Sequence, residues 1–199
     1  MKFGNDRRIE ERGDFLQEEN LVECKNYFEK INYVKDKFVE FDSNYLRSNY
    51  VSSRVDSLVS MEPIIVDLTN KISGLDEEKI DSKVSSLDVQ KLRKRKENLV
   101  RDKEKLVCEV QDYAYDVFVS YLNDEFRWKA LEIINEAERL NGESKKIVRN
   151  LKENINVMYE KVKVFANLED TMEIEKTFEL ICKYSDVILK DLKFLVKFF

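Results

Sequence analysis

Apolar residues recur at helical spacing along most of this chain. The clearest run begins after Asp170 and Glu173, whose three-residue separation is typical of a capping box at a helix start. Steps of four and three then place one apolar or small residue after another up to the last residue: Ile174, Phe178, Ile181, Ser185, Ile188, Leu192, Leu195 and Phe199. Because such steps keep side chains on one helix face, the pattern predicts a core-facing helix over 171–199.

The same spacing predicts five earlier helices, over 20–42, 50–72, 87–122, 126–140 and 147–165. The expected seam of the first helix is Leu21, Cys24, Phe28, Ile31 and Phe38, with a face widened by Tyr27, Val34 and Phe41. In the longest helix, leucine recurs every seven residues. Its first half is almost all charge and its second half is aromatic, so we expect the first half to project from the bundle and the second half to be buried.

Several residues predict where these helices are interrupted. Pro63 lacks a backbone donor and predicts an end or a kink, and Gly74 is a plausible residue for a helix end. Residues 76–84 indicate a short helix inside the connection that follows. Asn123-Asp124 and Asn141-Gly142 predict the two boundaries of the helix over 126–140.

These elements predict an all-α fold, an antiparallel bundle of about six helices with one long central helix. Residues 1–19 are dominated by charge and predict a flexible tether or a frayed helix, ahead of a single helical bundle domain over 20–199. With 4 Gly and 1 Pro among 199 residues, the chain has few turn residues, which favours long helices joined by short connections.

Charge and composition narrow the function. The net charge of −5 does not favour binding to nucleic acid or to an anionic membrane. The chain has no His, which removes the commonest general base and the commonest zinc ligand. Its four glycines are isolated, so no Gly-rich phosphate loop is present. We therefore predict no catalytic, cofactor-binding or metal-binding residues and no enzymatic activity.

The cysteines and the apolar segments bear on the compartment. Cys24, Cys108 and Cys182 lie far apart among apolar residues, which favours three buried free thiols over one disulfide and one free thiol. No segment is apolar for long enough to span a bilayer, and the charged start differs from a signal peptide. The residues alone are typical of a soluble intracellular chain.

The strongest local charge feature is a basic stretch of five residues: Lys91, Arg93, Lys94, Arg95 and Lys96. The simplest interpretation is a solvated helix face, and the functional one is a surface for an anionic partner. A nucleic-acid site over 91–105 is disfavoured because Glu97, Asp102 and Glu104 follow at once and no aromatic residue there offers base stacking.

An aromatic series between Tyr113 and Trp128 supplies the second candidate surface. Its rings occupy more than one helix face, so we expect most in the core and some exposed. Tyr121 and Trp128 are the candidate anchors for a protein partner.

The chain also has a characteristic composition. It begins with charged residues, its expected helices are rich in Lys, Asn, Asp and Glu with cores of Ile, Phe and Tyr, and Gly, Pro and His are scarce. Lys91–Leu99 (KLRKRKENL) and Asn150–Ile155 (NLKENI) show it. In this the chain resembles the plasmid-encoded helical surface lipoproteins of Lyme-disease spirochaetes. The resemblance implies a lipid-anchored outer-surface protein without enzymatic activity that binds a host protein. The chain departs from that pattern because it has no lipidation Cys near its start and has three internal Cys.

We therefore predict a non-enzymatic helical protein-interaction module without a cofactor, whose partner is a host protein or a second copy of the chain. If the resemblance holds, it is an antigen on the outer cell surface, held there through a lipid anchor that this chain lacks. The alternative is a cytoplasmic coiled-coil adaptor or assembly protein. A nucleic-acid-associated protein that uses 91–105 is a second alternative, and nucleic acid is the disfavoured partner.

Overall fold

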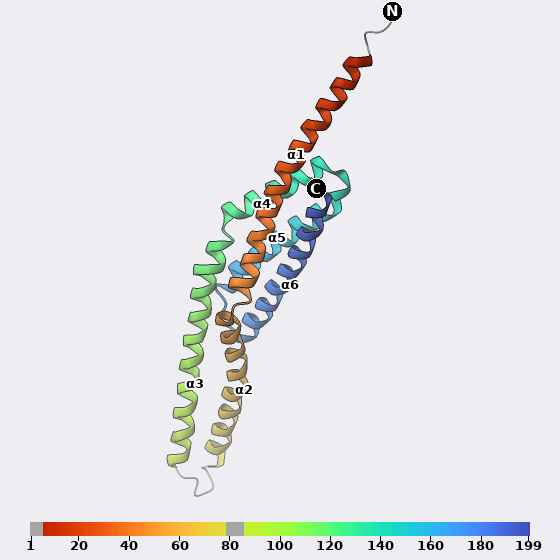
Figure 1. Cartoon of the computed structure of the whole chain (residues 1–199). Helices are drawn as coiled ribbons and strands as arrows, with labels where there is room; N and C mark the ends of the chain where they lie inside the picture. Colours follow the sequence, from red (N-terminus) through yellow and green to blue (C-terminus); the bar gives the residue numbers. More distant parts are fainter. Residues whose placement is uncertain (1–5, 79–85) are drawn as a thin grey trace, which may run out of the picture. The chain divides into compact units, whose positions relative to one another are not determined.

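The computed structural model describes residues 6–78 and 86–199, with side chains described for 22–75 and 87–199. Over these residues the chain is all-α and contains no strand, which confirms the predicted helical-bundle fold class. Six α-helices follow one another (Figure 1): α1 (Asp6–Glu40), α2 (Asn49–Glu78), α3 (Ser86–Tyr113), α4 (Asp124–Leu140), α5 (Lys145–Phe165) and α6 (Thr171–Leu195). Two π-helical segments, Phe41–Leu46 and Ala114–Val119, and two 3₁₀ turns, Gly142–Ser144 and Val196–Phe198, complete the helical elements of the described residues.

The internal contacts gather in two units. The terminal unit comprises Met1–Glu40, Asn123–Val157 and Tyr184–Phe199, and the hairpin unit comprises Phe41–Leu122 and Met158–Lys183. Helices α5 and α6 thus contribute to both. The backbone is helical over 6–19, as part of α1. The predicted tether over 1–19 and the single domain over 20–199 stay predictions.

In the terminal unit α1 packs against α4, and the 3₁₀ turn after α6 reaches α1. The buried face of α1 combines two residues of the predicted seam, Ile31 and Phe38, with the residues predicted to widen it. Tyr27 and Val34 are fully buried, whereas Phe28 is 41% exposed. The ring of Tyr27 packs 4.4 Å from that of Phe199, measured between centroids, which turns Tyr27 inward and its neighbour Phe28 outward. The seam prediction is confirmed at Ile31 and Phe38 and wrong at Phe28, because two adjacent stripes of α1 both carry apolar residues.

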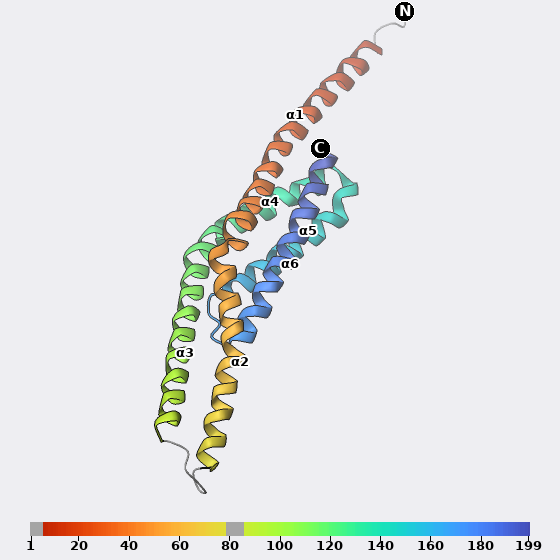
Figure 2. The same cartoon turned by 60° about the horizontal axis from the view of Figure 1, so that its bottom comes forward.

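In the hairpin unit α2 and α3 lie side by side and antiparallel (Figures 1 and 2). The first half of α3 packs beside α2, and its expected projection from the bundle stays a prediction. The pairing with α2 also accounts for the high charge of this half. Over 87–104 only Val89 is buried among the described side chains, so this half of α3 keeps a thin seam toward α2 and a wide solvated surface.

Neither predicted stop interrupts α2, which runs through Pro63 and Gly74 to Glu78. Pro63 and Ile64 are exposed, so water can solvate the Val59 carbonyl that Pro63 deprives of its helical donor. A solvated Gly74 costs helix stability of about 1 kcal/mol without ending the helix. The short helix predicted over 76–84 lies mostly outside the described residues.

The predicted boundaries of the later helices are confirmed. Asn123 Oδ1 accepts a hydrogen bond of 2.8 Å from the backbone N–H of Phe126 at the start of α4. Asn141 ends that helix. Asp170 Oδ1 accepts one of 3.0 Å from the N–H of Glu173 at the start of α6. The predicted stripe of α6 is buried or half-buried throughout, although the α-helix ends at Leu195 and a 3₁₀ turn follows.

Candidate interaction surfaces

The basic stretch lies on the solvated side of α3. Lys91, Arg93, Lys94 and Arg95 are exposed and Lys96 is half-buried. Over 91–105 the sequence has eight Lys and Arg residues against three Asp and Glu residues, in a chain whose net charge is −5. This segment of α3 therefore concentrates positive charge on an otherwise acidic protein.

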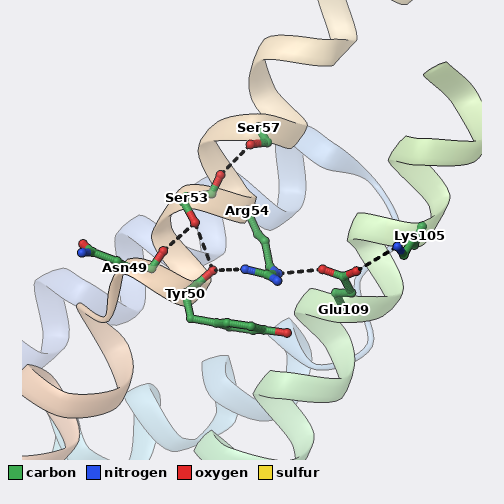
Figure 3. Close-up of polar contacts among 7 residues, drawn as sticks. All are labelled: Asn49, Tyr50, Ser53, Arg54, Ser57, Lys105 and Glu109. Carbon is green, nitrogen blue, oxygen red and sulfur yellow. Dashed lines mark hydrogen bonds and ion pairs between the residues drawn. The ribbon is translucent and has the colours of Figure 1, made fainter.

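A charged cluster joins α2 to α3 further along α3, toward its C-terminal end (Figure 3). Arg54 Nε donates a hydrogen bond of 2.7 Å to Glu109 Oε2, and its Nη1 donates one of 3.1 Å to the Tyr50 carbonyl. The guanidinium carbon lies 3.5 Å from the centroid of the Tyr50 ring, a cation–π contact. Lys105 Nζ lies 3.8 Å from the other oxygen of Glu109. Both Arg54 and Glu109 are half-buried, so salt screens their attraction less than that of an exposed pair.

Further contacts fix the register of the pair. Lys103 Nζ lies 2.6 Å from Glu62 Oε2, and the rings of Tyr50 and Tyr113 stack with centroids 4.9 Å apart. The contacting residue numbers rise along α2 as they fall along α3, as antiparallel pairing requires. Gln111 Nε2 also donates a hydrogen bond of 2.9 Å to the Leu168 carbonyl, which ties the loop between α5 and α6 to α3.

Two hollows lie along this helix pair. The first, of about 470 Å³, is lined by Ile72 of α2 and by Arg93, Lys96, Glu97, Val100, Arg101 and Glu104 of α3. The second, of about 360 Å³, is lined by Ile65 of α2, Glu169 of the α5–α6 loop, and Val100, Lys103, Glu104, Val107, Cys108 and Gln111 of α3. The two hollows are adjacent along α3, since they share Val100 and Glu104, and together they are called the helix-pair groove.

The two aromatic candidates have different surroundings. Tyr121 is half-buried in the hairpin unit, with its ring centroid 4.9 Å from that of Tyr45 and 6.0 Å from that of Phe41. Trp128 belongs to the terminal unit, is 64% exposed, and has the Arg127 guanidinium 5.2 Å from its ring centroid. Tyr121 is explained by its packing against Tyr45 and Phe41, whereas the ring of Trp128 is exposed to solvent. Their roles as anchors stay predictions.

The cysteines are three free thiols, but the predicted burial is wrong. Cys108 is exposed, and Cys24 and Cys182 are half-buried. On a helix Cys108 points about 100° away from its buried neighbour Val107, so it falls at the edge of the seam. Within the described residues, no three side chains of His, Cys, Asp or Glu come together as ligands for a metal ion. None of the described helices is both long and apolar enough to cross a membrane.

The basic residues were found from the sequence, and the groove was not. The only local signal would have been the second stripe of α3, in which Lys96, Val100 and Val107 recur at steps of four and seven among charged residues. That stripe becomes a groove only where Ile65 and Ile72 of α2 lie beside it.

Comparisons with known proteins show one partial similarity. The chain is 27% identical to cilia- and flagella-associated protein 43 of Xenopus laevis, over an alignment of 209 residues. The alignment spans 91% of this chain and 12% of that protein, so the chain corresponds in length to a small part of it. No family model and no solved structure matches the chain.

Proposed function

We propose that this chain is a non-enzymatic, helical protein-interaction module that works within a larger assembly of the kind named for its relative, one associated with cilia or flagella. The similarity extends over 91% of this chain, which is far more than any one of its helices. A role in assembly also agrees with a fold made of long helices whose outer faces stay solvated.

The observation that carries this proposal is the helix-pair groove beside the basic stretch. Salt bridges between α2 and α3 hold this surface in shape before any partner arrives, which lowers the entropic cost of binding. The sequence supplies no His and no Gly-rich phosphate loop, so the chemistry of the surface suits recognition better than catalysis.

The test is to isolate complexes from cells that express the chain. We compare the wild type with an Arg93→Glu/Lys94→Glu/Arg95→Glu variant, and with a Lys145→Glu/Lys146→Glu/Arg149→Glu variant of α5 that makes the same change in net charge at exposed positions. A defined set of proteins should be lost with the α3 variant and kept with the α5 variant. If the wild type retains no protein beyond the empty-tag control, the proposal is wrong.

The two other interpretations of the sequence have their own tests. Digestion of the chain by protease added to intact cells would support an outer-surface antigen. Binding to an oligonucleotide that falls steeply with salt and is abolished in the α3 variant would support a nucleic-acid function. We expect neither, because the similarity is to a cilia- and flagella-associated protein and acidic residues interrupt the basic stretch.

A further inference from the structure

The helix-pair groove has the length and form of a helix-binding site. From Arg93 to Gln111 its α3 residues recur at steps of three and four and so follow one face of the helix. At a rise of 1.5 Å per residue this face is about 27 Å long, which is the length of about 18 helical residues. Ile72 and Ile65 of α2 form its opposite wall.

We propose that this groove is the docking site for one amphipathic α-helix of a partner protein, and that the docked helix carries carboxylates toward the start of α3. This rests on the proposed function and adds to it the place and the chemistry of recognition. A helix in a groove is held by apolar anchors on successive turns, and its polar ends set direction and specificity.

Apolar surface is available along the groove. Ile65, Ile72 and Val100 are only half-buried, and Cys108 is exposed. Val107 is buried at the floor. A third helix placed here would cover these side chains in the way that α2 and α3 cover each other, and burial of apolar area would supply the main attraction.

The charges that line the groove favour a partner helix with acidic residues at one end. Arg93, Lys96 and Arg101 line the end of the groove near Ile72. The other residues of the basic stretch, Lys91, Lys94 and Arg95, are exposed on the same turns of α3 but do not line the groove. At the other end Glu169 lies on the loop that Gln111 ties to α3. This polarity complements a helix that is acidic at one end.

The other occupants fit this polarity less well. Glu97 and Glu104 also line the groove, and their carboxylates would repel a nucleic acid, whose phosphates recur at every nucleotide. A helix can place apolar or neutral residues opposite these two carboxylates and acidic residues opposite Arg93, Lys96 and Arg101. A second copy of the chain would bring the same excess of Lys and Arg to the interface. A carboxylate-bearing helix offsets that excess directly.

The experiment is a selection on the intact chain from a displayed library of 20-residue helical peptides with varied polar and apolar positions. We expect the selected peptides to share an apolar stripe at steps of three and four, with Asp and Glu gathered at one end. The reactivity of the Cys108 thiol then shows whether the selected peptides bind in the groove, and this readout needs no mutation. At a peptide concentration ten times the Kd, alkylation of Cys108 by iodoacetamide should slow about tenfold, while that of Cys24 in the terminal unit stays unchanged.

Matched charge variants test the direction of binding. Lys96→Glu/Arg101→Glu should slow association of the selected peptides about tenfold and weaken its salt dependence. Lys146→Glu/Arg149→Glu on α5 makes the same change in net charge at residues that line a separate hollow in the terminal unit, and should leave association unchanged. Circular dichroism confirms that both variants keep their helix content.

Each contrary result has a distinct meaning. Selected peptides that leave Cys108 equally reactive would overturn the groove proposal while leaving protein interaction as the function. A library that yields no binder, or binders without an acidic end, overturns it too. Cys108 protection by self-association or by an oligonucleotide would assign the groove to a second copy or to nucleic acid. Failure of the proposed function shows separately, as the absence of cellular partners.

Discussion

At the scale of the residue, the burial of single polar groups leads to specific predictions about the stability of the fold. Tyr27 is fully buried on α1, and its hydroxyl has no hydrogen-bond partner in the described part of the chain. Burial raises the pKa of Tyr27 well above its ordinary value of 10.0, and the negative charge of Glu136 raises it further. The unfolded chain releases this proton near the ordinary value while the folded chain keeps it, so alkaline pH destabilises the fold through Tyr27.

Tyr27→Phe removes that alkaline penalty. Near neutral pH the variant should be as stable as the wild type or gain about 1 kcal/mol, because an unpaired buried hydroxyl is lost. Above pH 10 its advantage should grow by about 1 kcal/mol per pH unit. Tyr115→Phe, at a ring that is 63% exposed, is the control and should show no such growth. Urea unfolding at a series of pH values measures this, and parallel curves for the two variants would refute it.

The Arg54–Glu109 pair should couple more strongly than an exposed ion pair. In a double-mutant cycle with Arg54→Met and Glu109→Gln, we expect a coupling free energy of about 1 kcal/mol, because both side chains are half-buried and well aligned. The Asp67–Lys71 pair on the solvated face of α2 is the comparison, with an expected coupling of about 0.3 kcal/mol. Equal couplings from the unfolding curves would show that the bridge does not stabilise the hairpin unit.

At the scale of the element, capping residues set where helices begin. Asp170 accepts a hydrogen bond from the N–H of Glu173, whereas the described residues give its neighbour Glu169 no such bond. Both carboxylates precede α6 and are exposed. Asp170→Ala should therefore cost about 1 kcal/mol of unfolding free energy, and Glu169→Ala less than about 0.5 kcal/mol. Thermal unfolding followed by circular dichroism compares them. A larger cost at Glu169 would mean that helix-dipole charge, and not the hydrogen bond, stabilises this start.

Helices with one apolar stripe could be predicted from the sequence, and those with competing signals could not. The pattern of α6 admits one buried face, and Ile174, Ser185 and Leu195 are buried on it as expected. In α1 two adjacent stripes compete, and a ring from the far end of the chain, Phe199, packs on Tyr27, which is buried while its neighbour Phe28 is exposed. Pro63 could not be judged locally either, because its cost depends on whether solvent reaches that side of α2.

At the scale of the whole molecule, the proposed binding surface is the helix-pair groove, which forms only where α2 packs against α3. The basic residues of α3 were visible in the sequence because charge is local. The groove was not, because Ile65 and Ile72 lie far from Val100 in the chain and only the antiparallel packing of α2 on α3 brings them together. Recognition on this account needs an intact helix pair whose groove is unoccupied in the free protein.

The most direct test of that claim is the mass of the free chain in solution, measured by light scattering after size exclusion over a wide concentration range. The account predicts a monomer of 23.8 kDa at every concentration, with the groove open to a helix of another protein. A dimer that persists on dilution, and that dissociates when Lys96 and Arg101 are both changed to Glu, would contradict it. The helix-pair groove would then be the interface by which the chain assembles with itself.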